Sequence, residues 1–332
     1  MHTLMQRALA AACLLLASGT AQAAGETKIA RLDPGLDAVI APGTKIEKVA
    51  GGFVFIEGPM WRDGKLWFSN VRGDKVRTYD PASGKVTVIL NDSGGVKNAP
   101  PDANFGSNAM ITDKDGSILL TRMAIGTIER MDDHGGLKPF LSKYDGKRFN
   151  SPNDLVFAAD GALWFTDPSF GLPKMDQDPK KELKFNAVFR YAGGKLTPVI
   201  TDMTQPNGLA FSPDGKTFYV SNSVPDMCVR AYDVGADGKL SNPRKIISYP
   251  GSAPDVPDGM KVDGAGNLWT TGPGGIRIIS PKGKVLGQIV LPEVCANIGF
   301  AEDGKTVYLT ASTSLYRLHT RVAGEIPIYY RK

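Results

Sequence analysis

Short runs of alternating apolar and polar residues recur along the chain, each beginning at a turn. Six turns are followed by similar runs: DGKLWFSN from Asp63, DGSILLTR from Asp115, DGALWFTD from Asp160, DGKTFYVSN from Asp214, AGNLWTTG from Ala265 and DGKTVYLTA from Asp303. An apolar segment such as LVFAA or LAFSP precedes each turn, and segments such as VRTYD or VFRYA follow in a second hairpin. Each copy therefore predicts four short antiparallel strands joined by tight turns.

The spacing of the copies predicts the architecture. The period varies between 38 and 54 residues, which suits four-stranded propeller blades and is too long for leucine-rich or ankyrin repeats. We therefore expect an all-β fold, a six-bladed β-propeller of four-stranded blades that forms one domain over residues 24–332. Residues 24–50 should pair with the C-terminal segment to complete the last blade, because ring closure removes exposed strand edges. Two β-sandwich domains are the alternative, although no Pro/Ser-rich linker divides the chain.

The composition is that of a globular protein rich in turns. The 332 residues are 42% hydrophobic and 22% charged, with 38 glycines and 23 prolines spread along the chain. The 39 basic residues exceed the 34 acidic ones only slightly and are scattered singly, so no nucleic-acid partner is expected. The sequence leaves open the oligomeric state, and it leaves open whether Cys228 and Cys295 form a disulfide or are two buried thiols.

Residues 1–23 have the pattern of a secretory signal peptide. Arg7 precedes an unbroken apolar run over residues 8–17, and residues 21–23, AQA, supply a small-x-small cleavage pattern. The apolar run is too short for a permanent membrane span. We therefore expect a mature protein without a membrane anchor, exported to the periplasm or secreted.

Candidate chemistry gathers at one end of the expected central channel. In a propeller, the loop that enters each innermost strand lies at the channel mouth, so equivalent positions of the copies converge there. Six or seven residues before each turn, every copy carries a side-chain oxygen, and we call these six residues the oxygen ring: Glu57, Asn108, Asn153, Asn207, Asp258 and Asn297. Oxygen ligands without His or Cys favour Ca²⁺, with Zn²⁺, Mn²⁺ or Mg²⁺ as alternatives. Ordinary turn residues are the alternative interpretation of these positions.

The six ring positions divide into two groups. Asn153, Asn207 and Asp258 each follow a proline, and together with Glu57 they form our predicted ligand set for one divalent cation. The other two ring residues lack the proline, and we expect them to line the substrate pocket. Two residues that come directly after inner strands, Arg122 and Phe170, are added to them. The predicted substrate-binding set is therefore Asn108, Arg122, Phe170 and Asn297.

Several motifs in sequence order resemble a known family. EGPMW, RFNSPNDL, LWFTDPSFGLP, QPNGLAFSPDGKTFYVSN and VPDGMKVDGAGNLW, all between residues 51 and 318, are similar to successive motifs of the senescence-marker-protein/gluconolactonase/regucalcin superfamily. The segment DQDPKKELKFNAVFRYAGGKL from Asp176 resembles the gluconolactonase branch. The resemblance implies a six-bladed propeller with one divalent ion, usually Ca²⁺, at the channel mouth. It also places the family's metal ligands on Glu57, Asn153, Asn207 and Asp258.

The resemblance further implies hydrolysis of lactones or, in relatives, of phosphoesters and phosphofluoridates. One departure bears on this specificity. Many gluconolactonases carry a Cys-Glu-His-Gly segment after the inner strand of the second blade, whereas this chain has TRMAIG at residues 121–126. The pocket histidine is therefore missing here, and the segment GGVKNAPPDANFGSN ahead of that blade also departs from the family.

Lactone opening needs an activated water or nucleophile and a group that stabilises the developing oxyanion. A divalent ion supplies both effects. Asp258 is then the candidate general base or nucleophile, and Asp154 is a second catalytic candidate that would orient Asn153 or move a proton. A carboxylate that only stabilises a turn is the alternative for Asp154. A Ser-His-Asp hydrolase is disfavoured because no GxSxG motif occurs.

These observations predict an exported, metal-dependent lactonase that acts on a small-molecule lactone or related ester. Two alternatives stay open. One is a metal-dependent phosphoesterase or organophosphate hydrolase on the same scaffold. The other is a non-catalytic propeller in which Ca²⁺ serves stability and the channel mouth binds a ligand.

Overall fold

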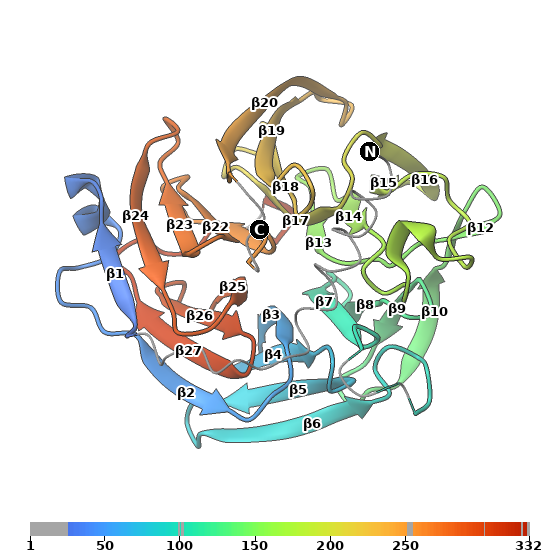
Figure 1. Cartoon of the computed structure of the whole chain (residues 1–332), viewed down its shortest axis with the longest axis horizontal. Coiled ribbons are helices and arrows are strands. Elements are labelled where there is room, and N and C mark those ends of the chain that lie inside the picture. Colours follow the sequence, from blue (N-terminus) through green and yellow to red (C-terminus); the bar gives the residue numbers. More distant parts are fainter. Residues whose placement is uncertain are drawn as a thin grey trace, which may run out of the picture.

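The computed structural model describes residues 26–98, 100, 103–250, 255–301, 303–326 and 328–330. The predicted signal peptide, residues 1–23, lies outside them. Six blades of antiparallel strands surround a central channel (Figure 1), which confirms the prediction of an all-β, six-bladed propeller. No helix in these described ranges is long and apolar enough to cross a membrane.

Each blade has four strands, except blade 5, which has five; the strands are named from the innermost outward, and the outermost strands of blades 5 and 6 come from the N-terminal segment. Blade 1 has β3 (Ile56–Arg62), β4 (Lys65–Asn70), β5 (Lys75–Asp80) and β6 (Lys85–Asn91); blade 2 has β7 (Ser107–Thr112), β8 (Ile118–Arg122), β9 (Thr127–Met131) and β10 (Leu137–Leu141). Blade 3 has β13 (Leu155–Phe157), β14 (Leu163–Asp167), β15 (Ala187–Ala192) and β16 (Lys195–Ile200); blade 4 has β17 (Pro206–Phe211), β18 (Thr217–Asn222), β19 (Cys228–Val234) and β20 (Leu240–Ser248). Blade 5 has β21 (Met260–Val262), β22 (Leu268–Gly272), β23 (Gly275–Ile279) and β24 (Val285–Val290); blade 6 has β25 (Cys295–Phe300), β26 (Thr306–Ala311) and β27 (Ser314–His319).

The N-terminal segment closes the disc, as predicted. β2 (Glu47–Gly51) pairs antiparallel with β27 and supplies the outer strand of blade 6. β1 (Lys28–Arg31) pairs with β24 and adds a fifth strand to blade 5, which the sequence did not predict. The segment thus covers the outer edges of two adjacent blades, and covering strand edges disfavours pairing with other chains. A two-stranded hairpin of β11 (Lys143–Tyr144) and β12 (Lys147–Arg148) lies between blades 2 and 3.

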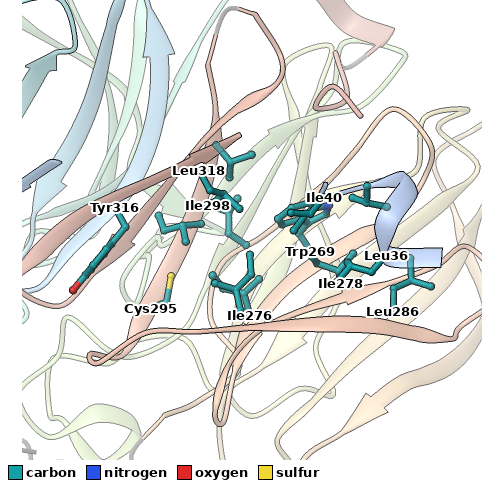
Figure 2. Close-up of a cluster of buried hydrophobic side chains, with 14 of the residues drawn as sticks. Leu36, Ile40, Trp269, Ile276, Ile278, Leu286, Cys295, Ile298, Tyr316 and Leu318 are labelled. Atoms are coloured by element: carbon teal, nitrogen blue, oxygen red, sulfur yellow. The ribbon is translucent and has the colours of Figure 1, made fainter. Parts of the chain in front are cut away.

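Apolar side chains fill the spaces between blades. The cluster in Figure 2 joins Trp269 and Ile278 of blade 5 to Ile298 of blade 6, and Leu36 and Ile40 from η1 (Pro34–Ala38) and the residues after it pack on its outer side. These side chains are fully buried, and each contributes about 1.5–3 kcal/mol relative to an exposed position. The cluster therefore ties the N-terminal segment to the propeller beyond the strand pairing.

The C-terminal segment crosses the end of the channel opposite the mouth. Gly324 forms an isolated bridge with Asp263 of the blade 5 turn. Further along, the Tyr330 hydroxyl in η3 (Ile328–Tyr330) donates to Thr112 O of blade 2 at 2.5 Å, and Tyr329 stacks on Phe157 with ring centroids 4.1 Å apart. The segment therefore connects blades on different sides of the channel.

Candidate active site

Regular strand pairing is interrupted at the oxygen ring in every blade. The inner strands shift register there in four blades, between Glu57 and Met60, Ser107 and Met110, Pro206 and Leu209, and Cys295 and Asn297. In blades 3 and 5 the ladder begins only at Leu155 and Met260, beyond the ring residues. Bulges of this kind occur beside active sites because they redirect side chains out of the sheet.

The structure places the six ring residues on neighbouring inner strands at one end of the channel. All six side chains are buried. Contacts between neighbouring inner strands hold them: Asn297 Nδ2 donates to Glu57 Oε2 (2.8 Å), Ala109 N to Asn153 O (3.2 Å), Gly208 N to Asp258 O (3.2 Å) and Gly259 N to Ala296 O (2.8 Å). The Asp258 carboxyl lies close enough to the Glu57 carboxyl for the two to interact electrostatically.

Glycine after a ring residue allows this close approach. A Cβ on Gly208 would lie 2.3 Å from Asp258 O and 2.7 Å from Gly259 Cα, closer than real Cβ contacts. Because backbone atoms form the obstacle, a larger side chain can be accommodated only if the strands of blades 4 and 5 move apart. The absence of a side chain at Gly208 therefore allows the inner strands of blades 4 and 5 to approach closely at the ring.

We expect Gly208→Ala to destabilise the protein by about 1–3 kcal/mol, because the added methyl group overpacks the contact between the two inner strands. Denaturant unfolding measures the loss. Gly235→Ala is the matched control, because Gly235 is exposed and its nearest obstacle is the flexible Asp237 side chain. Equal stability of the two variants would show that the inner strands do not approach as described.

The carboxyl groups of the ring lie in an environment that disfavours their charge. Burial raises the pKa of Glu57 to about 7. Burial and the neighbouring Glu57 carboxyl raise the pKa of Asp258 well above its ordinary value, and burial also raises the pKa of Asp154. Two buried carboxylates this close together repel each other when ionised unless a cation lies between them.

The polar atoms at the ring fit a hard cation. Within the described chain, the buried Asn207 Oδ1 and Asp154 Oδ2 have no hydrogen-bond partner, and a buried acceptor without a donor is destabilising. No group of three or more His, Cys, Asp and Glu side chains in that part of the chain is arranged to hold a metal ion. A cation at the ring would therefore need amide oxygens beside the carboxylates, which is the ligand chemistry of Ca²⁺.

A cavity of about 530 Å³ occupies the channel on the turn side of the ring. Its wall includes Asp154 and Asn297 from the ring region, and Glu325 and Tyr330 of the C-terminal segment. The Asp154 carboxyl accepts from Leu155 N at 2.8 Å with one oxygen and leaves the other without a partner among the described residues. Asp154 therefore faces the channel below the ring.

Lys261 also lines this cavity, and the sequence analysis missed it. Its ammonium group donates to Met260 O at 3.0 Å. It lies near enough to Asp154 and Glu57 to favour their charged forms. The repeat marks Lys261 as unusual, because it is a charged residue at a position, four residues before the turn, that is apolar in the other five copies: Pro59, Ile111, Val156, Ala210 and Gly299.

Arg122 is the last residue of β8, the second strand of blade 2, and it is held by a loop carbonyl and by a carboxylate of β9. Its guanidinium donates to Ser93 O at 2.8 Å and forms a 2.8 Å ion pair with Glu129, so it fastens the segment that precedes blade 2. Phe170 is half-buried in the turn after β14. Asn108 Nδ2 contacts Met123 Sδ at 3.5 Å, next to the segment where the family histidine is missing.

The long connection over residues 168–185, which includes η2 (Met175–Gln177), is tied down beside the ring. The Asp176 carboxylate accepts from Asn186 Nδ2 at 2.9 Å and from Gln205 Nε2 at 3.0 Å. Gln205 Nε2 also donates to Ser169 Oγ at 2.9 Å. These bonds join the connection to the segment that enters β17.

Cys228 and Cys295 are both buried free thiols.

Comparison with known proteins agrees with this architecture. Residues 55–313 match the SMP-30/Gluconolactonase/LRE-like region. A gluconolactonase of Zymomonas mobilis is 37% identical over 331 residues, covering 92% of each chain. A 6-deoxy-6-sulfogluconolactonase of Pseudomonas putida is 27% identical over 77% of this chain and 82% of its own. The solved structure of a gluconolactonase from Xanthomonas campestris superposes with a TM-score of 0.78 at 29% identity, covering 90% of this chain and 98% of the other. The chain therefore belongs to the SMP-30/gluconolactonase/LRE-like family.

Proposed function

We propose that this protein is a metal-dependent lactonase that opens a sugar lactone at the channel mouth. The observation that carries the proposal is the convergence of two buried carboxylates and an unpartnered amide oxygen at one end of the channel. The lactonases among its relatives support the reaction class, hydrolysis of a cyclic ester. The metal dependence rests on the donor set of the ring.

Glu57, Asn153, Asn207 and Asp258 would hold the cation. When bound, a divalent ion supplies Lewis-acid stabilisation of the carbonyl oxygen and lowers the pKa of a nearby water. Asp258 takes the proton of the attacking water, whose oxygen bonds to the lactone carbonyl carbon while the ring C–O bond breaks. The leaving hydroxyl oxygen then takes up a proton, so that water is added overall and a hydroxy acid is formed.

The substrate approaches from the channel mouth. On the turn side, Glu325 and Tyr330 wall the cavity, and the C-terminal segment runs across from blade 5 to blade 2. On the mouth side, the connection over residues 168–185 is hydrogen-bonded to Gln205, two residues before Asn207 of the ring. Asp154 therefore acts from below, where it orients Asn153 or accepts a proton without touching the substrate.

A substrate panel tests the proposal. With Ca²⁺ present, the purified mature protein should hydrolyse glucono-1,5-lactone and a pentonolactone, and a phosphotriester should react far more slowly. Rates are measured by acid release at a pH where spontaneous opening is slow. Preferential phosphotriester hydrolysis would overturn the lactonase assignment in favour of an organophosphate hydrolase. The absence of any turnover, together with Ca²⁺-dependent melting, would indicate a binding propeller.

We also propose export to the periplasm or the medium. The support is the sequence pattern of residues 1–23, a basic start, an apolar run and an AQA cleavage pattern. Fractionation of expressing cells and N-terminal sequencing of the product test it. Uncleaved protein in the cytoplasm would contradict it.

A further inference from the structure

Six buried hydroxyl groups surround the oxygen ring. The second strand of each blade carries Ser or Thr six or seven residues after the turn, and each of these side chains is fully buried. We call this set the hydroxyl collar: Ser69, Thr121, Thr166, Ser221, Thr271 and Thr310. A fully buried hydroxyl group is destabilising unless it is hydrogen-bonded, so its presence in all six copies calls for a role.

Four of the six collar hydroxyls bond to the backbone of ring residues, whereas the Thr166 hydroxyl accepts from Asp154 N and the Ser69 hydroxyl bonds to Ser107 Oγ. Thr121 Oγ1 donates to Asn153 O at 2.9 Å, which links blade 2 to blade 3. Ser221 Oγ of blade 4 donates to Asp258 O at 2.8 Å, while Asp258 N donates to Thr271 Oγ1 at 3.2 Å. The peptide groups of Asp258 are therefore held from both sides by collar hydroxyls.

The collar replaces strand pairing where that pairing fails. The inner-strand ladder skips Asn108 and Asn207 and begins only after Asn153 and Asp258, so the peptide groups there need other partners. Thr271 illustrates the substitution, because its hydroxyl accepts from Asp258 N and also lies 3.1 Å from Gly259 O and 3.3 Å from Ala296 O. One side chain thus joins the entries of blades 5 and 6.

We propose that the hydroxyl collar positions the ligand-bearing backbone of the cation site, with Thr271 as the positioning residue for Asp258. This inference rests on the proposed function, since it concerns the same site. Hydrogen-bonded groups behind metal ligands fix ligand orientation, and their loss typically weakens metal binding by about 10–100-fold. Loss of a collar hydroxyl should therefore weaken Ca²⁺ binding more than it weakens the fold.

Adjacent threonines on β22 provide a matched test. Thr270 is as fully buried as Thr271, but among the described residues its hydroxyl donates to Thr271 O at 3.2 Å and is not hydrogen-bonded to a ring residue. Thr271→Val and Thr270→Val each remove one buried hydroxyl. Both should lower the melting temperature in EDTA by a similar amount. Only Thr271→Val should weaken Ca²⁺ binding in calorimetric titration, by about tenfold or more, and Thr271→Ser should restore it.

The outcomes separate this inference from the proposed function. If the wild-type protein binds Ca²⁺ and both valine variants bind it as tightly, the collar is structural only and the inference fails while the proposed function stands. Equal weakening in both variants would have the same meaning. If the wild-type protein binds no divalent cation, the proposed function fails, and the positioning role fails with it. If Thr271→Val does not fold, Ca²⁺ binding by Ser221→Ala is measured against the same control, because this variant removes the hydroxyl that donates to Asp258 O.

Discussion

Asp258→Asn is expected to lower kcat for a sugar lactone by about 10²–10⁴-fold, the range that a positioned general base contributes. The amide keeps the shape of the side chain and one oxygen for the cation, but it cannot accept a proton from water. Initial rates at saturating Ca²⁺, with bound metal measured in the same samples, distinguish loss of the base from loss of the cation. The change should appear in kcat more than in KM.

Asp255→Asn is the matched control for this variant. Asp255 lies three residues before Asp258 in the segment that leads into β21, and its carboxylate accepts from Gly274 N at 3.4 Å, outside the ring. The Asp255→Asn variant should therefore keep the wild-type rate. An Asp258→Asn protein that binds Ca²⁺ and turns over at the wild-type rate would contradict the role given to Asp258. Asp154→Asn would then be the next variant to measure.

Glu57→Gln is expected to stabilise the metal-free protein at pH 8 by about 1–3 kcal/mol. It should also weaken Ca²⁺ binding, because the number of charged ligands sets the affinity of an oxygen site for Ca²⁺. The folded-state pKa of Glu57 is raised from 4.5 to about 7. Its contribution to stability is therefore fully present below about pH 4.5 and is lost as the pH rises through 7. The unfolding free energy of the metal-free wild-type protein should fall across this window, and that of the variant should fall less.

Denaturant unfolding in EDTA at pH 5 and pH 8 measures this effect. Glu47→Gln is the control, because Glu47 is an exposed partner of Arg317 and such surface pairs contribute about 0–1 kcal/mol. We claim that the buried Glu57 carboxylate destabilises the metal-free protein and binds the cation. A Glu57→Gln protein that is less stable than wild type in EDTA at pH 8 and still binds Ca²⁺ tightly would contradict this claim.

The repeat pattern was sufficient to predict the blades and the ring. Turn dipeptides and period-two alternation are local, so six copies predicted six blades, and equivalent positions had to converge in a closed disc. The closure by β2 followed from the need to cover a strand edge. The extra pairing of β1 with β24 had no such signal, because the fifth strand of a blade is an addition that the repeat does not require.

Other features depend on contacts that a sequence pattern does not encode. Tyr330 reaches blade 2 through a backbone carbonyl, and Arg122 is bound by carbonyl oxygens of the preceding segment. A backbone carbonyl partner leaves no mark in the sequence, and in the case of Arg122 only the ion pair with Glu129 involves a side chain of complementary charge. Lys261 and the hydroxyl collar were visible as positions in the repeat, but their meaning required the bulges at the ring and the cavity below it.

Titration of Ca²⁺ into the metal-stripped enzyme, followed by the rate of glucono-1,5-lactone hydrolysis, shows whether the oxygen ring is a catalytic cation site. We expect negligible turnover in the stripped protein and a rate that rises in proportion to added Ca²⁺ until one equivalent is bound. A stripped protein shown by elemental analysis to hold no metal, yet hydrolysing the lactone at the full rate, would contradict this expectation.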